Sequence, residues 1–260
     1  MTLRRLESPC VLCSPVGSGI YGRMVRECLE AEGIKPLVFL EEENGCCYCL
    51  IEADGERSFL SHHGAEYLFS RSFTRNIDFN KTDSVYVSGL EIEEPTGSEI
   101  IEFVYEHPEL ELYFAPGPRI TRIEKGRVEK LFKRRDSHGK GPVLHLNERE
   151  ACSFTGKESI QGAAEFLSEK TGNALVITLG EKGCYCYDMH NDSSGCFVPP
   201  YPADAVDTTG AGDAHCGAVI AGLRKGQTLR EACETANRIG AAVVGNKGNQ
   251  YPRPNGRFTD

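Results

Sequence analysis

The sequence lacks any run of about 18 consecutive apolar residues, the length that a membrane-spanning helix requires. Residues 1–15 also lack the long apolar stretch and the small-residue cleavage site of a secretory signal peptide. We therefore expect a cytoplasmic protein with no membrane partner.

An excess of basic residues is missing as well, because 29 lysines and arginines are outnumbered by 38 aspartates and glutamates. Nucleic acids and acidic membranes are normally bound by a basic face, so a formal net charge of -9 argues against both. A small-molecule partner fits this balance better. The 40% hydrophobic and 26% charged residues are close to the average of folded globular proteins.

There is no internal repeat, low-complexity block or proline-rich linker that would divide the chain. A length of 260 residues is ordinary for one α/β domain. We predict a single domain over residues 1–260.

Paired C-x-x-C motifs at zinc-site spacing are also missing, because Cys10 and Cys13 form one such motif and no second pair follows. Several of the twelve cysteines lie in apolar runs, where buried thiols are common, among them Cys10, Cys13, Cys184 and Cys186. We predict reduced core cysteines in preference to a structural zinc site.

Short apolar or β-branched runs alternate with longer amphipathic stretches, which indicates βαβ units and a mainly parallel sheet. The predicted strands are 84–88, 110–114, 143–146 and 174–178. The predicted helices are 96–106, 123–134, 160–170, 212–223 and 229–244. Residues 35–61 differ, because short strands at 37–40, 46–53 and 57–60 are separated by turn signals. We predict a small β lid there.

The segment 206–213, with the sequence VDTTGAGD, precedes a helix rich in small residues. Glycines at a helix entrance let an anion approach the backbone, so the N–H groups of Gly210, Ala211 and Gly212 are candidates for an anion hole. Asp213 stands beside this hole, where a carboxylate can take the proton of an attacking hydroxyl during phosphoryl transfer. The alternative is a glycine-rich turn in which Asp213 is an N-terminal helix cap.

The segment 207–213, followed by Gly217 and Ala218, resembles the second signature of the ribokinase-like or pfkB carbohydrate kinases. Weaker resemblances follow the family's order at 16–22 and 55–59. The resemblance implies a Rossmann-like three-layer α/β sandwich with a mainly parallel sheet and a small β lid. It also implies ATP-dependent phosphorylation of a hydroxyl of a small sugar or nucleoside.

In that family comparison Asp213 is the general base, and Arg57 and Gly89 face the acceptor. Asn147 and Glu150 resemble the family's N-x-x-E motif, which implies that Asn147 lies near the phosphates and that Glu150 helps to hold Mg²⁺ through water. The alternative for Asn147 is a helix cap after a strand.

Residues 178–183 resemble the family's nucleotide loop, which implies that Thr178, Gly180 and Gly183 approach ATP. An ordinary β-turn has glycines at the same places. Asn237 and Gly240 match the helix that packs against the adenine in related kinases, although core packing explains these residues almost as well.

The resemblance further implies a potassium ion behind the anion hole, held with the help of Asp207 and Thr209. Related kinases often pair through their lid strands, so we expect a homodimer through the segment 46–53. His62, His63 and His215 are expected to be exposed or core residues instead of metal ligands or acid–base groups.

Part of the family pattern is missing, because the sequence begins after the first strand and the residues that grip the sugar in related kinases. Gly19 and Ala115 also stand where the family commonly has aspartate. The alternative function is therefore a non-catalytic, truncated kinase-like protein that binds nucleotide only. A dinucleotide-dependent dehydrogenase is disfavoured, since no early strand leads into G-x-G-x-x-G with an acidic residue about 20 positions later.

Overall fold

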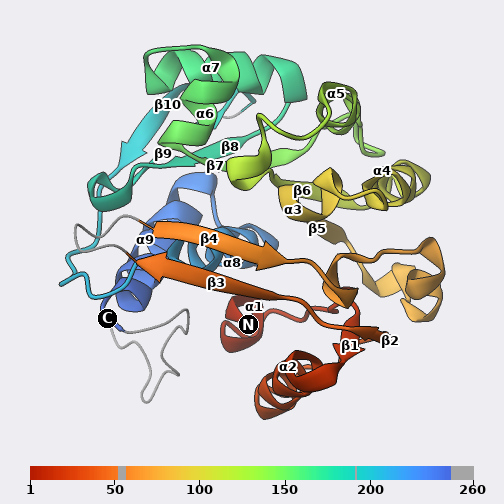
Figure 1. Cartoon of the computed structure of the whole chain (residues 1–260). Helices are drawn as coiled ribbons and strands as arrows, with labels where there is room; N and C mark the ends of the chain where they lie inside the picture. Colours follow the sequence, from red (N-terminus) through yellow and green to blue (C-terminus); the bar gives the residue numbers. More distant parts are fainter. Residues whose placement is uncertain (52–56, 191, 247–260) are drawn as a thin grey trace.

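The computed structural model describes residues 1–51, 57–190 and 192–246. A six-stranded sheet crosses the molecule in the order β10-β9-β8-β7-β6-β5 (Figure 1). Its strands are β5 (Ser84–Ser88), β6 (Glu111–Ala115), β7 (Val143–Asn147), β8 (Leu175–Thr178), β9 (Cys184–Asp188) and β10 (Asp192–Val198). The pairs from β5 to β8 are parallel, while β9 and β10 are added antiparallel. The prediction of a mainly parallel sheet is confirmed.

Helices cover both faces of the sheet, which confirms the three-layer sandwich (Figure 1). One face packs against α3 (Gly89–Glu93), α4 (Gly97–Glu106), α5 (Lys125–Lys133), α6 (Glu148–Thr155) and α7 (Ile160–Thr171). The opposite face packs against α8 (Ala211–Arg224) and α9 (Leu229–Val244), and the short α1 (Thr2–Arg5) lies beside α8. Short 3₁₀ helices are η1 (Ala65–Tyr67), η2 (Arg71–Asn76), η3 (Phe79–Lys81), η4 (Gly117–Arg119) and η5 (Gly180–Lys182).

The sequence analysis did not predict β9 and β10. Along β9 the side chains alternate, because Tyr185 and Tyr187 join the core under α7 while Cys184 and Cys186 join the core under α9. Both faces of this strand are therefore buried, and no contrast of polar and apolar residues marks it in the sequence.

The N-terminal region forms two small sheets. β1 (Val16–Ser18) leads into α2 (Gly19–Ala31) and pairs in parallel with β2 (Phe39–Glu43). β3 (Cys46–Ile51) and β4 (Arg57–His62) form an antiparallel hairpin. The expected strand at 37–40 is thus displaced to 39–43 and pairs with β1 instead of extending the hairpin.

The β3–β4 hairpin, which we call the lid hairpin, confirms the predicted strand pair, while the expected turn at Asp54 and Gly55 lies outside the described residues. Its surface is apolar: Tyr48, Leu50, Phe59 and Leu60 are each more than half exposed, at 56%, 57%, 65% and 65%. A hairpin of two strands has no core of its own, which leaves these side chains in water.

Burial of the cysteines divides them into two groups. Cys184 and Cys186 are buried as predicted, whereas Cys10 is exposed and Cys13 only partly covered. The expectation for Cys10 is wrong because residues 7–15 follow the surface as an irregular segment. In the ranges that the structure describes, no helix is both long and apolar enough to cross a bilayer.

Candidate active site

The first turn of α8 is shaped by the loop before it. Gly210 occupies the N-cap position with φ of 76°, a conformation that strongly favours glycine. Just before it, the carboxylate of Asp207 accepts a hydrogen bond from the N–H of Thr209 at 2.9 Å. The N–H groups of Val206 and Asp207 in turn donate to the carbonyl of Val244 at the end of α9. The loop is therefore tied to α9 as it enters α8.

Two of the three amides proposed for the anion hole have no acceptor in the described part of the chain, namely those of Gly210 and Gly212. The third, Ala211, donates to the carbonyl of Thr208 at 3.3 Å, because the tight turn uses it internally. A Cβ at Gly212 would meet no atom within 4 Å. The space before the helix is thus open, and the helix dipole favours an anion there.

Asp213 is the third residue of α8, and the carboxylate makes no hydrogen bond or ion pair to any residue the structure describes. The alternative of a helix cap is wrong, because Gly210 takes the cap position and no side chain caps this helix. Although Asp213 is open to solvent on one side, surrounding protein desolvates the carboxyl group and raises its pKa. An unpartnered carboxylate with a raised pKa is suited to accept a proton.

Two residues near Asp213 were not found from the sequence. Tyr86 on β5 and Glu91 on α3 both have a pKa raised mainly by burial, with the negative charge of Asp213 adding to the effect. The hydroxyl of Ser88 donates a hydrogen bond to the Glu91 carboxylate. These groups are distant from Asp213 in the sequence, so only the fold brings them near it. Glu91 follows the expected Gly89 by two residues, which is the only local signal.

Asn147 and Thr178 lie side by side where β7 and β8 end. Asn147 is also the N-cap of α6: its Oδ1 accepts from the N–H of Glu150 at 2.8 Å. Glu150 reaches back, accepting from the N–H of Asn147 at 3.0 Å and from its Nδ2 at 2.8 Å. Burial raises the pKa of Glu150 against the effect of these bonds. The cap is thus present, and each carboxylate oxygen keeps a second lone pair for a water molecule.

The loop from Thr178 to Gly183 is a tight turn between β8 and β9. The N–H of Leu179 donates to the carbonyl of Gly183 at 2.8 Å. Gly180 and Gly183 have φ of 61° and 89°, and a Cβ at Gly183 would collide with the carbonyl oxygen of Val198. Turn geometry therefore accounts for both glycines locally, and their approach to ATP stays a prediction.

Asn237 belongs to a buried hydrogen-bond chain. Its Nδ2 donates to the carbonyl of Pro199 at 2.8 Å, which leaves Oδ1 to accept from Nε2 of His215 at 3.1 Å. Nδ1 of His215 lies 2.9 Å from Nε2 of His145, which continues the hydrogen-bond chain. His215 is thus a core residue as expected, and His62 and His63 are exposed.

The protein itself uses the Asn237 amide for hydrogen bonds, and the contact of Asn237 and Gly240 with a nucleotide stays a prediction. A Cβ at Gly240 would meet no atom within 4 Å, which leaves that side of α9 open.

The two other residues expected to face the acceptor are Arg57 and Gly89. Arg57 begins β4 opposite Ile51, and its side chain lies outside what the structure describes. Gly89 is buried at the start of α3, where a Cβ would collide with the carbonyl of Pro116. The structure therefore explains Gly89 by close backbone packing, and its contact with an acceptor stays a prediction.

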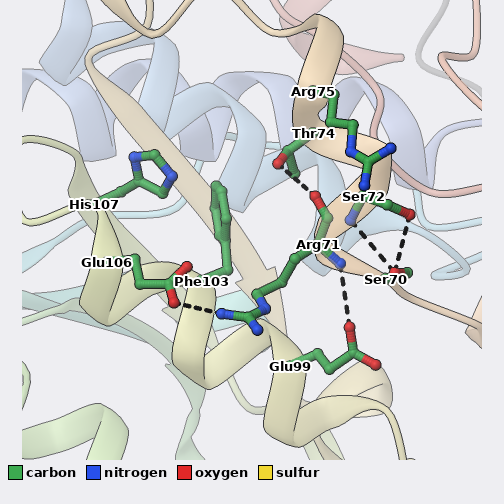
Figure 2. A pocket seen from close by; sticks show the side chains of 9 residues that line it. All are labelled: Ser70, Arg71, Ser72, Thr74, Arg75, Glu99, Phe103, Glu106 and His107. Atoms are coloured by element: carbon green, nitrogen blue, oxygen red, sulfur yellow. Dashed lines mark hydrogen bonds and ion pairs between the residues drawn. The ribbon is translucent and has the colours of Figure 1, made fainter.

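Two clefts of the surface do not include Asp213. One, of about 410 Å³, lies between η2 and α4 and is shown in Figure 2, where Arg71 hydrogen-bonds to Glu99 and pairs with Glu106. The guanidinium of Arg71 is thus paired with a carboxylate inside this cleft. The other, of about 340 Å³, lies between α2 and the lid hairpin. Neither carries the features of the α8 entrance.

No group of three or more His, Cys, Asp or Glu side chains is arranged to hold a metal ion within the described ranges. Mg²⁺ in nucleotide sites needs only one or two protein carboxylates beside water and phosphates. The Glu150 carboxylate next to Asn147 has the chemistry for this, and its role at Mg²⁺ stays a prediction.

A model of the pfkB family carbohydrate kinases matches residues 1–256. The chain is 31% identical to the uncharacterized sugar kinase YegV of Escherichia coli over 253 residues, 95% of this chain and 76% of that protein. It is 27% identical to fructokinase-1 of Oryza sativa subsp. japonica over 264 residues, 95% of this chain and 80% of that protein. The chain belongs to the pfkB family of carbohydrate kinases.

Solved structures confirm the ribokinase-like fold. An adenosine kinase from Sinorhizobium meliloti superposes with a TM-score of 0.82 at 19% identity, over 96% of this chain and 76% of that one. A putative ribokinase II from Escherichia coli, in complex with ATP and Mg²⁺, gives 0.80 at 20% identity, over 95% and 80%. The chain therefore combines membership of the carbohydrate kinase family with the ribokinase-like fold.

Proposed function

We propose that this protein transfers the γ-phosphoryl group of ATP to a hydroxyl of an uncharged sugar or nucleoside, with Asp213 as the general base. The observation that carries the proposal is the entrance of α8. There a carboxylate with a raised pKa and no partner among the described residues stands beside two amides that have no acceptor in the same ranges. An acidic side chain of this kind beside an open anion site is a candidate for catalysis.

In the proposed reaction the acceptor hydroxyl lies between Asp213 and the phosphoryl group. Asp213 takes its proton as the oxygen attacks, and the N–H groups of Gly210 and Gly212 stabilise the charge on the transferring phosphoryl oxygens. The positive end of the α8 dipole acts in the same direction. These steps need only groups that the structure places at one helix end.

The acceptor is proposed to be uncharged because its site is negative. Glu91 and Asp213 lie near enough for their charges to interact. An acceptor that already bears a phosphate would meet two carboxylates, and such like-charge contacts oppose binding. The Glu91 carboxylate and the Tyr86 hydroxyl are suited to hydrogen-bond neutral hydroxyl groups instead.

Mg²⁺ would neutralise the nucleotide phosphates when bound. The putative ribokinase II that shares this fold was solved with ATP and Mg²⁺, which supports the same pair here. Asn147 and Glu150 would orient the waters of the ion, and Thr178, Gly180, Gly183 and Gly240 would border the nucleotide. A K⁺ ion beside Asp207 and Thr209 remains part of the proposal on the family resemblance alone.

The dimer is proposed to form between two lid hairpins. Its support is the apolar face of Tyr48, Leu50 and Leu60, which lie on one side of the hairpin and which a second copy would cover. Light scattering after size exclusion is expected to give twice the chain mass, and Leu60→Lys is expected to give the monomer. A monomeric parent chain at micromolar concentration would rule the dimer out. We also propose a cytoplasmic location, which is consistent with the family.

The test is Mg²⁺-dependent release of ADP from ATP across uncharged sugars and nucleosides, including fructose, ribose, adenosine and cytidine, with their phosphates as negative controls. Asp213→Asn is compared with Asp204→Asn, an exposed aspartate in the loop before α8. We expect turnover with an uncharged acceptor to fall about 100-fold or more in Asp213→Asn and to persist in Asp204→Asn, since general bases contribute 10²–10⁴-fold.

A residual rate within about tenfold of the parent in Asp213→Asn would remove the general-base role. ATP binding without turnover on any acceptor would favour the alternative of a kinase-like protein that binds nucleotide only. Turnover that prefers a sugar phosphate would overturn the uncharged acceptor while leaving the kinase in place.

A further inference from the structure

Four cysteines meet beneath α9 and form what we call the cysteine cluster: Cys184 and Cys186 on β9, Cys196 on β10 and Cys233 on α9. Cys184, Cys186 and Cys233 are buried in one core, and Cys196 packs against it. Sγ of Cys186 lies 3.1 Å from Sγ of Cys196. None of the four belongs to the proposed phosphoryl-transfer site.

Cys186 and Cys196 have the backbone placement that a disulfide needs. They are directly opposite in the antiparallel pair of β9 and β10. Opposite residues in such a pair have Cα atoms about 4.5–5.5 Å apart, inside the range of about 4.4–6.8 Å that disulfides span. Their sulfur atoms must approach by only about 1 Å to reach the bond length of about 2.05 Å.

Access differs along the cluster. Cys184, Cys186 and Cys233 are buried, at 0%, 4% and 0% exposure, whereas Cys196 is partly exposed. A small oxidant therefore reaches Cys196 first. Cys186 is the sulfur that touches Cys196 from within.

We propose that Cys186 and Cys196 are an oxidation site, at which a peroxide converts the two thiols into a disulfide. The Cys196 sulfur, as thiolate, attacks one peroxide oxygen, breaks the O–O bond and becomes a sulfenic acid, while the leaving hydroxide takes up the thiol proton as water. The Cys186 thiolate then attacks the sulfenic sulfur and displaces hydroxide, which takes the second proton. In balance, two thiols are oxidised, one hydrogen peroxide is reduced, and two waters leave.

The surroundings of Cys186 favour the second step. The hydrogen bond from Cys233 is the main cause that lowers the pKa of the Cys186 thiol, and contact with Cys196 adds to it, against the effect of burial. Cys152 offers an internal contrast, because it is also partly exposed but burial raises the pKa of its thiol. Cys186 and Cys196 are therefore expected to react before Cys152.

The test treats the reduced full chain with a small excess of hydrogen peroxide, alkylates the remaining thiols, and digests with trypsin and a protease that cleaves before aspartate. Asp188 and Asp192 lie between the two cysteines, so Cys186 falls in peptide 183–187 and Cys196 in peptide 192–203. Mass spectrometry is expected to find these two peptides joined with the loss of two hydrogens. Cys152 is expected to be mostly alkylated in the same sample.

Matched variants identify the sulfur atoms. The joined peptides are expected to persist in Cys184→Ser and to disappear in Cys186→Ser, since Cys184 shares peptide 183–187 but not the contact with Cys196. Loss in Cys184→Ser and persistence in Cys186→Ser would overturn the assignment. The parent chain alone can also refute it: Cys186 and Cys196 both alkylated while Cys152 is oxidised would show that the contact does not direct oxidation.

Discussion

Replacing Glu150 by glutamine separates its role as a helix cap from its proposed role near Mg²⁺. The carboxylate accepts from the Asn147 N–H at 3.0 Å and from the Asn147 Nδ2 at 2.8 Å. A glutamine keeps one acceptor oxygen, and glutamine as well as glutamate completes a capping box. At most one of the two hydrogen bonds is lost. We expect the free energy of unfolding in urea to fall by about 1 kcal/mol or less.

Loss of the negative charge has a larger effect if Glu150 orients water on Mg²⁺. Substituting groups in the outer shell of a metal typically weakens its binding 10–100-fold. That corresponds to about 1.4–2.8 kcal/mol, which exceeds the effect on folding. A titration of Mg²⁺ at fixed ATP, followed by ADP release, is expected to shift by this factor while maximal turnover at saturating Mg²⁺ changes less.

Glu148→Gln is the matched control, because Glu148 lies in the same first turn of α6 but is exposed and is not the capping partner of Asn147. It is expected to leave the Mg²⁺ titration unchanged. An unchanged titration in Glu150→Gln together with a stability loss above about 1 kcal/mol would show that Glu150 acts only as a cap.

Three further variants test the entrance of α8 and the turn before β9. The pKa of Asp213 is raised on folding, so the folded state holds the proton more tightly, and stability is lost as pH rises from the ordinary aspartate pKa through the folded value. Asp213→Asn is therefore expected to have a higher urea midpoint than the parent at neutral pH, and a lower midpoint would contradict the desolvated carboxylate. The acid limb of the parent's pH–rate profile is expected above the ordinary aspartate pKa. Gly212→Ala is expected to unfold no more easily than the parent, since alanine favours helix by up to about 1 kcal/mol and its Cβ meets no protein atom within 4 Å. Its turnover is expected to fall at least about tenfold, because the methyl group would meet the phosphoryl group. Full turnover would place the anion elsewhere. Gly183→Ala is expected to destabilise the fold by more than about 1 kcal/mol in urea, because φ is 89° and the new Cβ collides with Val198, and an unchanged midpoint would refute the strain.

Local sequence patterns were sufficient for much of the fold. The strand at 84–88 and the helix at 229–244 have the predicted bounds, because their apolar periodicity and end signals lie within the segments themselves. The glycine-rich entrance of α8 was likewise visible, since Gly210, Gly212 and Asp213 are neighbours in the chain. What these residues need from the backbone, a positive φ and open amides, follows from their type and order.

The partners of those residues depend on tertiary structure. Glu91 and Tyr86 lie near enough to feel the charge of Asp213 because the fold brings β5 and α3 to the first turn of α8, and no spacing in the sequence encodes that approach. β9 was missed because both of its faces are buried, which removes the alternation that marks a strand. The contact between Cys186 and Cys196 depends on the register of β9 with β10. The sequence by itself determined the chemistry that each residue can perform. The packing of distant elements decided which groups meet, because contacts between side chains depend on separation in space and not along the chain.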